Sequence, residues 1–383
     1  MKKLIRTTTI GASLDILVKG QLRFLNGYFE LVAVSGEDQH LENVRNREGV
    51  RTFSVPMQRQ ISPFKDLISL YQLYVFFRKE KPEIVHSMTP KAGLLSMAAA
   101  RFAGVPIRIH TFTGLIFPSK NGMMQKILIF MDRLLCSFAT HIYPEGQGVK
   151  NDLIHFNITD KPLNVIANGN VNGVDCNYFN PDLYPENEKK RLKDELKISP
   201  DDFIYIFIGR LVGDKGINEL VAAFKKLAAE RPNIQLLLVG GIEADLDPLL
   251  PETATEIETN PKIISVGFQP DIRPYLAIAD ALIFPSYREG FPNVVLQAGA
   301  MGLPAIVTDI NGCNEIIEHG NNGIIIPAKS EKAVYKSMIE LAGDSLLLSN
   351  MRKNSRAVIL RKFAQQEVWN ALLLEYQKLL KAL

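Results

Sequence analysis

Short apolar runs alternate with helical patterns along this 383-residue chain, and this alternation restricts the fold more than any other feature. In the front half, strands are expected at 3–10, 28–34, 50–55, 83–86, 107–110, 141–143 and 163–167. Helical spacing lies between them, for example over 66–79, 91–103 and 123–139. Strands that alternate with helices pair in parallel. We therefore expect a parallel sheet with helices on both faces.

The alternation stops once and then starts again. Residues 168–175 are rich in turn formers, and 177–200 is a polar stretch with a charged run. Further strands are expected at 203–208, 234–239, 263–267, 282–285, 304–308 and 323–326. A chain of this length can fill two cores. We predict an α/β protein with two Rossmann-like, doubly wound domains that face a central cleft, the first over 1–175 and the second over 190–363. The amphipathic last helix, about 364–383, is expected to pack back on the first domain.

Charge is distributed unevenly between the two halves. Residues 1–185 carry 21 Lys/Arg and 15 Asp/Glu, whereas the remainder carries 23 and 26. A basic front half favours an anionic partner such as a lipid phosphate or a membrane surface, with simple solubility as the alternative. The excess is too small to indicate nucleic acid.

The three cysteines and the N-terminus point to a compartment. Cys136, Cys176 and Cys313 are far apart and odd in number, which gives neither a disulfide framework nor zinc-ligand spacing. The N-terminus lacks the apolar core of a signal peptide, and no stretch is long and apolar enough to span a bilayer. We therefore expect a cytoplasmic protein, whose basic front half would allow peripheral contact with the inner face of the plasma membrane.

Two helices of the front half carry apolar faces whose role the sequence leaves open. The aromatic residues of 66–79 are expected in the core: Tyr71, Tyr74, Phe76 and Phe77. The 123–136 helix sets methionine, isoleucine, leucine and phenylalanine against Lys126 and Arg133. Such a helix suits a membrane surface, and core packing explains its apolar face equally well.

Two loops carry the features of an anion site. Gly209–Gly216 follows the strand at 203–208, and Arg288–Asn293 follows the strand near 281–284. Open α/β sheets bind ligands at this carboxyl edge. The first loop supplies Arg210 and Lys215. The second precedes a helix at Pro292, whose neighbouring N–H groups lack intrahelical partners. A diphosphate would find fixed positive charge in one loop and a helix dipole in the other. The alternatives are a solvated pair of cations and a Glu289 that merely complements the dipole.

Other ligand motifs are weak. No Gly-x-Gly-x-x-Gly follows the first strand, and no Walker loop is present. Asp245 and Asp247 have the spacing that can hold a divalent metal, but their acidic loop precedes a helix, and capping is the favoured interpretation. No metal is assigned.

Further motifs lie at Ser286–Ala298, Gly302–Val307, Gly209-Arg210 with Lys215-Gly216, and Asn172–Asp175. Together they resemble the motifs of family-four glycosyltransferases, whose signature is a Glu followed by a second Glu at a fixed distance. Residues 17–22 and 86–93 are similar to the bacterial branch that assembles lipid-linked surface polysaccharides.

The resemblance implies a GT-B fold and a retaining, metal-independent sugar transfer from a nucleotide diphosphate, without a cofactor. Family frequency favours UDP as the nucleotide. Arg210 and Lys215 would neutralise the leaving diphosphate. Glu289 would bind hydroxyls of the donor sugar. The phosphate-binding backbone would come from Gly209, Gly290, Phe291, Pro292 and Asn293. His110, the match to the family's active-site histidine, would lie beside the transferred sugar, although a lone histidine at a strand end is usually structural.

Three further assignments complete the expected site. Position 297, which would hold the ribose, is Gln instead of Glu, so it loses charge-assisted pairing. Gly11 stands alone where many relatives have a glycine-rich run toward the phosphates. His86 and Lys91 would contact a lipid-linked saccharide acceptor, with a structural role as the alternative.

The leading hypothesis is a transferase that moves a hexose or N-acetylhexosamine from a UDP-sugar to this acceptor in capsule or other surface polysaccharide synthesis. An isomerase similar to UDP-N-acetylglucosamine 2-epimerase is the second hypothesis, but no convincing set of acid/base carboxylates is found for it. A non-catalytic nucleotide-sugar-binding subunit is the third, suggested only by Gln297.

Overall fold

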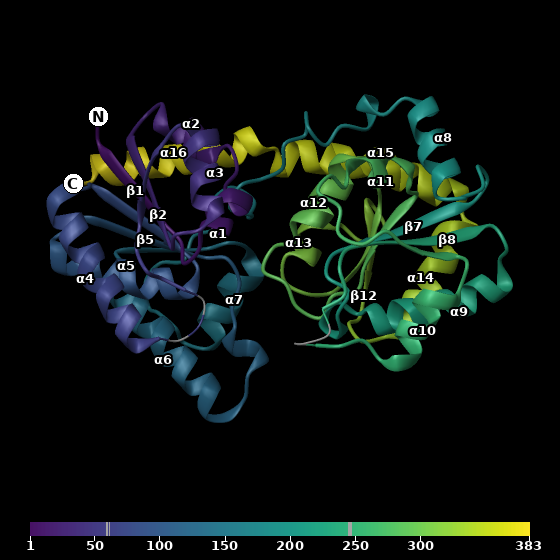
Figure 1. Ribbon diagram of the computed structural model, residues 1–383, viewed down its shortest axis with the longest axis horizontal. Coiled ribbons are helices and arrows are strands. Elements are labelled where there is room, and N and C mark those ends of the chain that lie inside the picture. Colours follow the sequence, from purple (N-terminus) through teal and green to yellow (C-terminus); the bar gives the residue numbers. More distant parts are fainter. Residues whose placement is uncertain (59, 61, 244–246) are drawn as a thin grey trace. The chain divides into compact units, whose positions relative to one another are not determined.

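The computed structural model of the chain describes residues 1–58, 60, 62–243 and 247–383 (Figure 1). The chain divides into two compact units, which are treated separately below. Unit 1 comprises Met1–Gly173 and Gln366–Leu383, and unit 2 comprises Val174–Gln365. Each unit contains one six-stranded sheet whose strand pairs are all parallel. The prediction of two Rossmann-like, doubly wound domains is confirmed.

Unit 1 has the strand order β3-β2-β1-β4-β5-β6. Its strands are β1 (Lys3–Thr7), β2 (Glu30–Ser35), β3 (Arg51–Ser54), β4 (Ile84–Met88), β5 (Ile107–Phe112) and β6 (His141–Pro144). Its helices are α1 (Gly11–Leu17), α2 (Gln21–Asn26), α3 (Gln39–Glu48), α4 (Pro63–Glu80), α5 (Pro90–Ala103), α6 (Gly122–Phe138), α7 (Gln147–His155) and, from Gln366, α16 (Gln365–Lys381), with a short 3-10 turn at Phe117–Ser119. The strand order reverses between β1 and β4.

Two local predictions for unit 1 are wrong. The expected strand at 163–167 is reduced to one bridge between Leu163 and Ile142, because the chain turns at Ala167, whose φ is 52°. In α4, Phe76 and Phe77 lie in the core as expected, but Tyr71 is 67% exposed. The helical repeat places Tyr71 on the side of α4 opposite the buried Leu73.

Unit 2 has the order β12-β11-β10-β7-β8-β9, which is the same topology with a new set of strands. Its strands are β7 (Phe203–Ile208), β8 (Ile234–Val239), β9 (Ile263–Ser265), β10 (Ala281–Phe284), β11 (Ala305–Thr308) and β12 (Gly323–Ile326). Its helices are α8 (Glu186–Glu195), α9 (Ile217–Glu230), α10 (Pro251–Thr259), α11 (Arg273–Ile278), α12 (Asn293–Ala300), α13 (Cys313–Ile316), α14 (Glu331–Gly343) and α15 (Ser345–Phe363), with 3-10 turns at Pro181–Leu183 and Gly213–Lys215.

The central strands of unit 2 show why a parallel sheet forms. Every residue of β8 is buried, and five of the six residues of β7 are buried. A strand that is apolar along its whole length needs cover on both faces, which helices provide in an α/β sheet. Helix α9 provides such cover, because its apolar residues Ile217, Leu220, Val221 and Phe224 recur at helical spacing and are all buried.

The polar stretch after residue 175, predicted as an interdomain segment, packs within unit 2. Arg356 of α15 donates to the carbonyl oxygens of Cys176 at 3.0 Å and Phe179 at 2.9 Å. The guanidinium carbon of Arg273 lies 3.5 Å from the centre of the Tyr178 ring. Residues 174–189, which include the start of α8 at Glu186, therefore belong to the second structural unit.

Candidate functional site

Two loops of unit 2 leave neighbouring strands at the point where the strand order reverses. Strands β7 and β10 pair through Ala281 with Tyr205 and Leu282 with Ile206. The chain continues from β7 toward β8 on one side of the sheet and from β10 toward β11 on the other. Doubly wound sheets bind ligands beyond the carboxyl ends of the strands at this switch point. The loops 209–216 and 285–292 thus lie where the fold favours a ligand.

Close backbone packing fixes the start of the first loop. Gly240 has a φ of 152°, and a Cβ atom there would lie 1.8 Å from the carbonyl oxygen of Gly209. The N–H of Leu211 then donates to the carbonyl of Gly241 at 2.8 Å. A side chain at position 240 would push the two strand ends apart, so glycine is required there.

Asp247 holds the next part of this loop. The N–H of Gly213 donates to the backbone carbonyl of Asp247 at 3.2 Å, and the N–H of Asp214 donates to its carboxylate. The predicted helix-capping role of the Asp245–Asp247 pair is therefore replaced, at Asp247, by a contact with a distant turn. Asp245 lies outside the described residues.

The second loop is fastened to the first by hydrogen bonds around Asp214. The N–H of Tyr287 donates to the carbonyl of Asp214 at 2.9 Å, and Arg288 Nη2 lies 2.8 Å from its Oδ2. Gly216, with a φ of 71°, packs so closely that a Cβ there would lie 2.2 Å from the carbonyl oxygen of Pro285. The two loops therefore pack together in spite of their separation in sequence.

Lys215 and Glu289 meet inside this structure. The Lys215 ammonium contacts Oε1 of Glu289, and the two side chains are 16% and 18% exposed. Ser286 Oγ lies 3.0 Å from the same carboxylate oxygen. Thr308 of β11 in turn donates to the carbonyl of Ser286. A half-buried cation beside a fixed carboxylate can bind an anionic group and a hydroxyl group side by side.

Arg210 occupies the same loop but points elsewhere in this structure. Its Nη1 lies 2.6 Å from Oε2 of Glu243, and the side chain is 49% exposed. An exposed ion pair of this kind is weakly held, because water screens it and both side chains keep rotational freedom. The Arg210 guanidinium is therefore free to exchange Glu243 for another anion at low cost.

The second loop ends at the N-terminus of α12. Pro292, expected at the first helical position, instead precedes the helix, which begins at Asn293. The first N–H groups of a helix have no intrahelical acceptor and carry the positive end of its dipole. Gln297 lies in the second turn of α12 and is half-buried. Among the described residues, its side-chain amide has no hydrogen-bond partner.

The predicted residues of unit 1 lie in its interior, beginning with His110. The His110 imidazole is buried, with Nδ1 2.8 Å from Ser87 Oγ. A Cβ at Gly93 would come within 2.5 Å of its Cε1 atom. Burial lowers the pKa of His110 to about 3, so the ring is neutral. This packing accounts for the residue, and its contact with a transferred sugar stays a prediction from the resemblance.

His86 and Lys91 also have partners within unit 1. His86 is buried between Tyr376, 2.5 Å from Nδ1, and Thr111, 2.7 Å from Nε2. Burial, and after it the charge of Arg6, lowers the pKa of His86 well below its usual value. Lys91 Nζ lies 2.8 Å from Oδ1 of Asp66. Their predicted contact with an acceptor is not tested by these arrangements.

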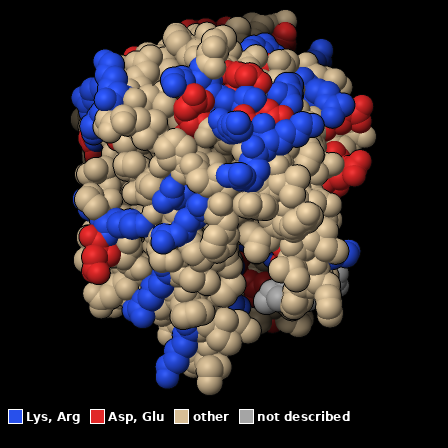
Figure 2. Space-filling view, turned by 90° about the vertical axis from the view of Figure 1, so that its left-hand side faces the viewer, with Lys and Arg blue, Asp and Glu red and all other residues tan. Residues whose placement is uncertain are grey.

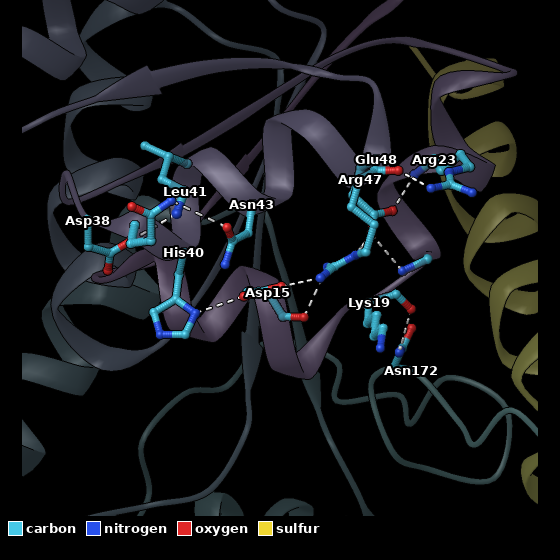
Figure 3. Close-up of polar contacts among 12 residues, drawn as sticks. Asp15, Lys19, Arg23, Asp38, His40, Leu41, Asn43, Arg47, Glu48 and Asn172 are labelled. Carbon is cyan, nitrogen blue, oxygen red and sulfur yellow. Dashed lines mark hydrogen bonds and ion pairs between the residues drawn. The ribbon is translucent and has the colours of Figure 1, made fainter. Parts of the chain in front are cut away.

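Gly11 is explained by the packing of α1 against α3. Its N–H donates to Oδ2 of Asp38 at 2.9 Å, and a Cβ there would lie 2.0 Å from Oδ1 of the same carboxylate. Asp38 also caps α3 by accepting from Leu41 N–H, as Figure 3 shows. Nearby, Asp15 lies between His40 and Arg47 and joins the same two helices (Figure 3). The predicted contact of Gly11 with a phosphate again stays a prediction.

Sequence reasoning gave no role in the site to three residues that shape it. Asp247 and Thr308 position the two loops, and Ser286 positions Glu289. Ser286 could have been found, because it lies two residues after the end of β10 and precedes Glu289 by one short turn. Asp247 and Thr308 carry no local signal, since their partners are 33 and 22 residues away.

The described ranges contain no group of three or more His, Cys, Asp or Glu side chains that could hold a metal ion. The three cysteines are buried free thiols. Within the same ranges, none of the helices has the length and apolar character needed to cross a bilayer.

Comparison with known proteins gives consistent matches over the whole chain. Residues 27–169 match the family described as glycosyl transferase 4-like domain, and residues 188–358 match glycosyl transferases group 1. The chain is 30% identical to the capsular polysaccharide biosynthesis glycosyltransferase CapM of Staphylococcus aureus, covering 99% of this chain and 98% of that protein. It is 29% identical, over 82% of its length and 81% of the relative, to the UDP-Gal:alpha-D-GlcNAc-diphosphoundecaprenol alpha-1,3-galactosyltransferase of Escherichia coli.

Solved structures agree in fold. A glycosyltransferase from Rickettsia africae superposes with a TM-score of 0.81 at 18% identity, over 99% of each chain. Anabaena HepE in complex with UDP and glucose gives 0.81 at 16% identity, over 99% of this chain and 100% of that one. The two doubly wound units thus form a GT-B fold, and the family matches show that the protein is a glycosyltransferase. The chain belongs to the glycosyl transferases group 1, the family-four glycosyltransferases.

Proposed function

We propose that this enzyme transfers a hexose or N-acetylhexosamine from a UDP-sugar to a lipid-linked saccharide, with retention of anomeric configuration, in surface polysaccharide synthesis. The names of two relatives support this proposal. CapM of Staphylococcus aureus acts in capsular polysaccharide biosynthesis, and the Escherichia coli enzyme uses UDP-Gal and a diphosphoundecaprenol-linked acceptor. Retention of the anomeric configuration is supported by the resemblance of the sequence motifs to those of the retaining family.

The observation that supports the donor site best is the Lys215–Glu289 pair at the switch point of unit 2. Sugar transfer leaves negative charge on the nucleotide diphosphate as the glycosidic bond breaks. A cation that is already in place stabilises this charge without reorganisation, and its effect is larger in a half-buried site than in water. We assign this role to Lys215, with Arg210 as a second cation from the exposed side of the loop.

The neighbouring groups fit the rest of the donor. Glu289, held by Lys215 and Ser286, would accept hydrogen bonds from hydroxyls of the sugar. The N-terminus of α12 would face the phosphates, since its N–H groups and dipole favour an anion. Gln297 would bind the ribose with its amide. In this proposal side chains and backbone supply the charge that a metal ion supplies in other transferases.

The experiment compares Lys215→Ala with Lys226→Ala, which removes the same charge from an exposed lysine of α9. UDP binding is measured by calorimetry, and transfer is measured with UDP-galactose or UDP-N-acetylglucosamine and N-acetylglucosaminyl diphosphoundecaprenol. Lys215→Ala should lower UDP affinity about tenfold and turnover about 100-fold or more, because the charge matters most in the transition state. Lys226→Ala should behave like the wild type.

Two results would contradict the proposal. Normal turnover of Lys215→Ala would show that the donor site does not lie in these loops. Conversion of UDP-N-acetylglucosamine to its epimer without any acceptor would show that the protein is an isomerase and not a transferase.

A further inference from the structure

Two helices of unit 1 expose apolar side chains along their outward faces. The docking face is defined by ten exposed residues: Phe64, Leu67, Ile68, Tyr71 and Val75 of α4, and Met123, Met124, Ile127, Phe130 and Met131 of α6. In both helices they recur at helical spacing, so they form a stripe on one side of the helix. The opposite sides of the helices pack into the unit 1 core through Leu73, Phe77 and Leu135.

Helix α5 brings the two stripes together. It packs against both α4 and α6 (Figure 1). Its middle part, Ser96–Ala100, consists of small residues and one methionine, all buried. Small side chains let the flanking helices approach closely, and α5 therefore adds little to the surface except Arg101 and Phe102. The apolar stripes of α4 and α6 lie on one helical layer.

On α4 and α6, basic side chains lie on the exposed side and acidic side chains lie on the inward side. Helix α6 carries Lys126 and Arg133 beside its exposed stripe, whereas Asp132 falls on the inward side by the helical repeat. In α4, Asp66 is on the inward side and pairs with Lys91 at 2.8 Å. Arg78 and Lys79 are exposed at the end of that helix.

The sequence from α5 to the end of α6 is also short of acids. Residues 91–139 contain six Lys or Arg and one acid, Asp132. Burial raises the pKa of Asp132 to about 7, which weakens its negative charge further. Figure 2 looks at this end of unit 1 and shows Lys and Arg spread over much of the surface, with acidic side chains gathered in a few places.

We propose that the docking face binds the surface of an anionic lipid bilayer. Apolar side chains would enter the boundary between headgroups and acyl chains, while Lys126 and Arg133 would meet lipid phosphates at its edge. This inference deepens the proposed function, on which it rests, because a lipid-linked acceptor is held in a bilayer. The excess of cations favours anionic lipid over a protein partner, since acids that could pair with a complementary protein lie on the inward sides.

The experiment measures sedimentation of the full-length protein with vesicles. Vesicles of phosphatidylcholine with about one third phosphatidylglycerol, which have a negative surface potential, are compared with vesicles of pure phosphatidylcholine. The test variant is Phe64→Ser with Phe130→Ser, at positions 85% and 63% exposed. The matched control is Phe268→Ser with Leu346→Ser in unit 2, at positions 79% and 70% exposed. Thermal unfolding confirms that both variants fold.

The wild type and the control should sediment with anionic vesicles, more weakly as salt is added and weakly with pure phosphatidylcholine. The test variant should partition about tenfold less, because two large apolar contacts are lost. Equal binding by test and control variants would overturn the proposal. The proposal would also be overturned if the wild type bound neither kind of vesicle and light scattering showed a dimer that is absent in the test variant. The docking face would then bind a second copy of the chain.

A failure here can be told from a failure of the proposed function. The vesicles contain no acceptor, and Lys215→Ala should bind them like the wild type. Conversely, the Phe64→Ser and Phe130→Ser variant should keep its affinity for UDP, which depends on unit 2.

Discussion

The phenol oxygen of Tyr376 lies 2.5 Å from Nδ1 of His86, although 290 residues separate them in the sequence. Arg6 Nη1 lies 3.0 Å from the same oxygen. Because arginine can only donate, the tyrosine oxygen accepts from Arg6 and its hydrogen points to His86. The neutral imidazole then carries its hydrogen on Nε2, toward Thr111 at 2.7 Å. This chain of hydrogen bonds fixes α16 to strands β1 and β4 of unit 1.

We expect Tyr376→Phe to lower the free energy of unfolding of unit 1 by about 1–3 kcal/mol, because Arg6 and His86 stay buried and lose a partner. The single tryptophan, Trp369, lies in the same helix, so its fluorescence in a urea titration reports the loss. Tyr335→Phe, which removes a hydroxyl bonded to Glu230 at an exposed site, is the control and should change stability little.

A second prediction concerns the contact between Gly93 and His110. Gly93→Ala should destabilise unit 1 by about 1–3 kcal/mol, because the new methyl group would overlap the imidazole and Leu135 Cδ1, which lies 2.6 Å from its position. Gly241→Ala is the control, since no atom lies within 4 Å of its Cβ position. Unfolding of Gly93→Ala, His110→Ala and the double variant would measure the coupling. Additive effects would show that the two residues do not press on each other.

Much of the fold could be predicted because its signals are local. The apolar runs of β7 and β8 are buried along nearly their whole length, and each run is bounded by turn residues. The loop from Gly209 to Gly216 is found at a strand end for the same reason. The pattern does not give the strand order, and so it does not give the switch point between β7 and β10, because these depend on which distant strands pair.

The rest could not be predicted because it depends on contacts between distant residues. The Asp247 carboxylate accepts from the N–H of Asp214, which lies 33 residues away. In the sequence, its place before a helix favours a capping role instead. Tyr71 belongs to an aromatic run, and only the direction of α4 in the unit decides that it is exposed. The buried position of His110 follows from the absence of a side chain at Gly93, which no pattern around either residue reveals.

Asp247 gives a prediction about the donor site. Asp247→Ala should raise KM for the UDP-sugar about tenfold and change kcat less, because the Gly213–Lys215 turn loses its anchor while Lys215 keeps its charge. Asp247→Asn retains an oxygen that can accept from Asp214 N–H and should recover most of the affinity. Steady-state kinetics of the three proteins test this. Equal KM values would show that the turn is held without Asp247.

The buried histidines predict how stability depends on pH. The pKa of His110 is lowered to about 3, and that of His86 is lowered well below its usual 6.5. The unfolded chain therefore binds protons below about pH 6.5 that the folded chain does not, and stability falls as pH falls. Each histidine contributes a slope of up to about 1.4 kcal/mol per pH unit over this window.

Urea unfolding followed by Trp369 fluorescence at pH 7.5, 6.5 and 5.5 measures this slope. His110→Asn, which can keep a hydrogen bond to Ser87, should make the pH dependence shallower whatever its effect at pH 7.5. A slope equal to that of the wild type would mean that His110 is accessible to protons in the folded state.

The last prediction concerns Gln297, where the sequence departs from the family signature. A ribose hydroxyl donates more strongly to a carboxylate than to an amide, and charge-assisted bonds are roughly twice as strong as neutral ones. Position 297 lies in the second turn of α12, beyond the first turn in which the helix dipole acts most strongly, so the contact with the ribose should decide the change in affinity. Gln297→Glu should therefore tighten UDP binding about threefold to tenfold in calorimetry.

Gln269→Glu controls for the added charge and should leave UDP affinity unchanged. Gln269 is half-buried in another loop of unit 2, where its Nε2 donates to the carbonyl of Val266. Weaker binding by Gln297→Glu would mean that its carboxylate repels the diphosphate more than it attracts the ribose, and the ribose would then have to be placed elsewhere along α12.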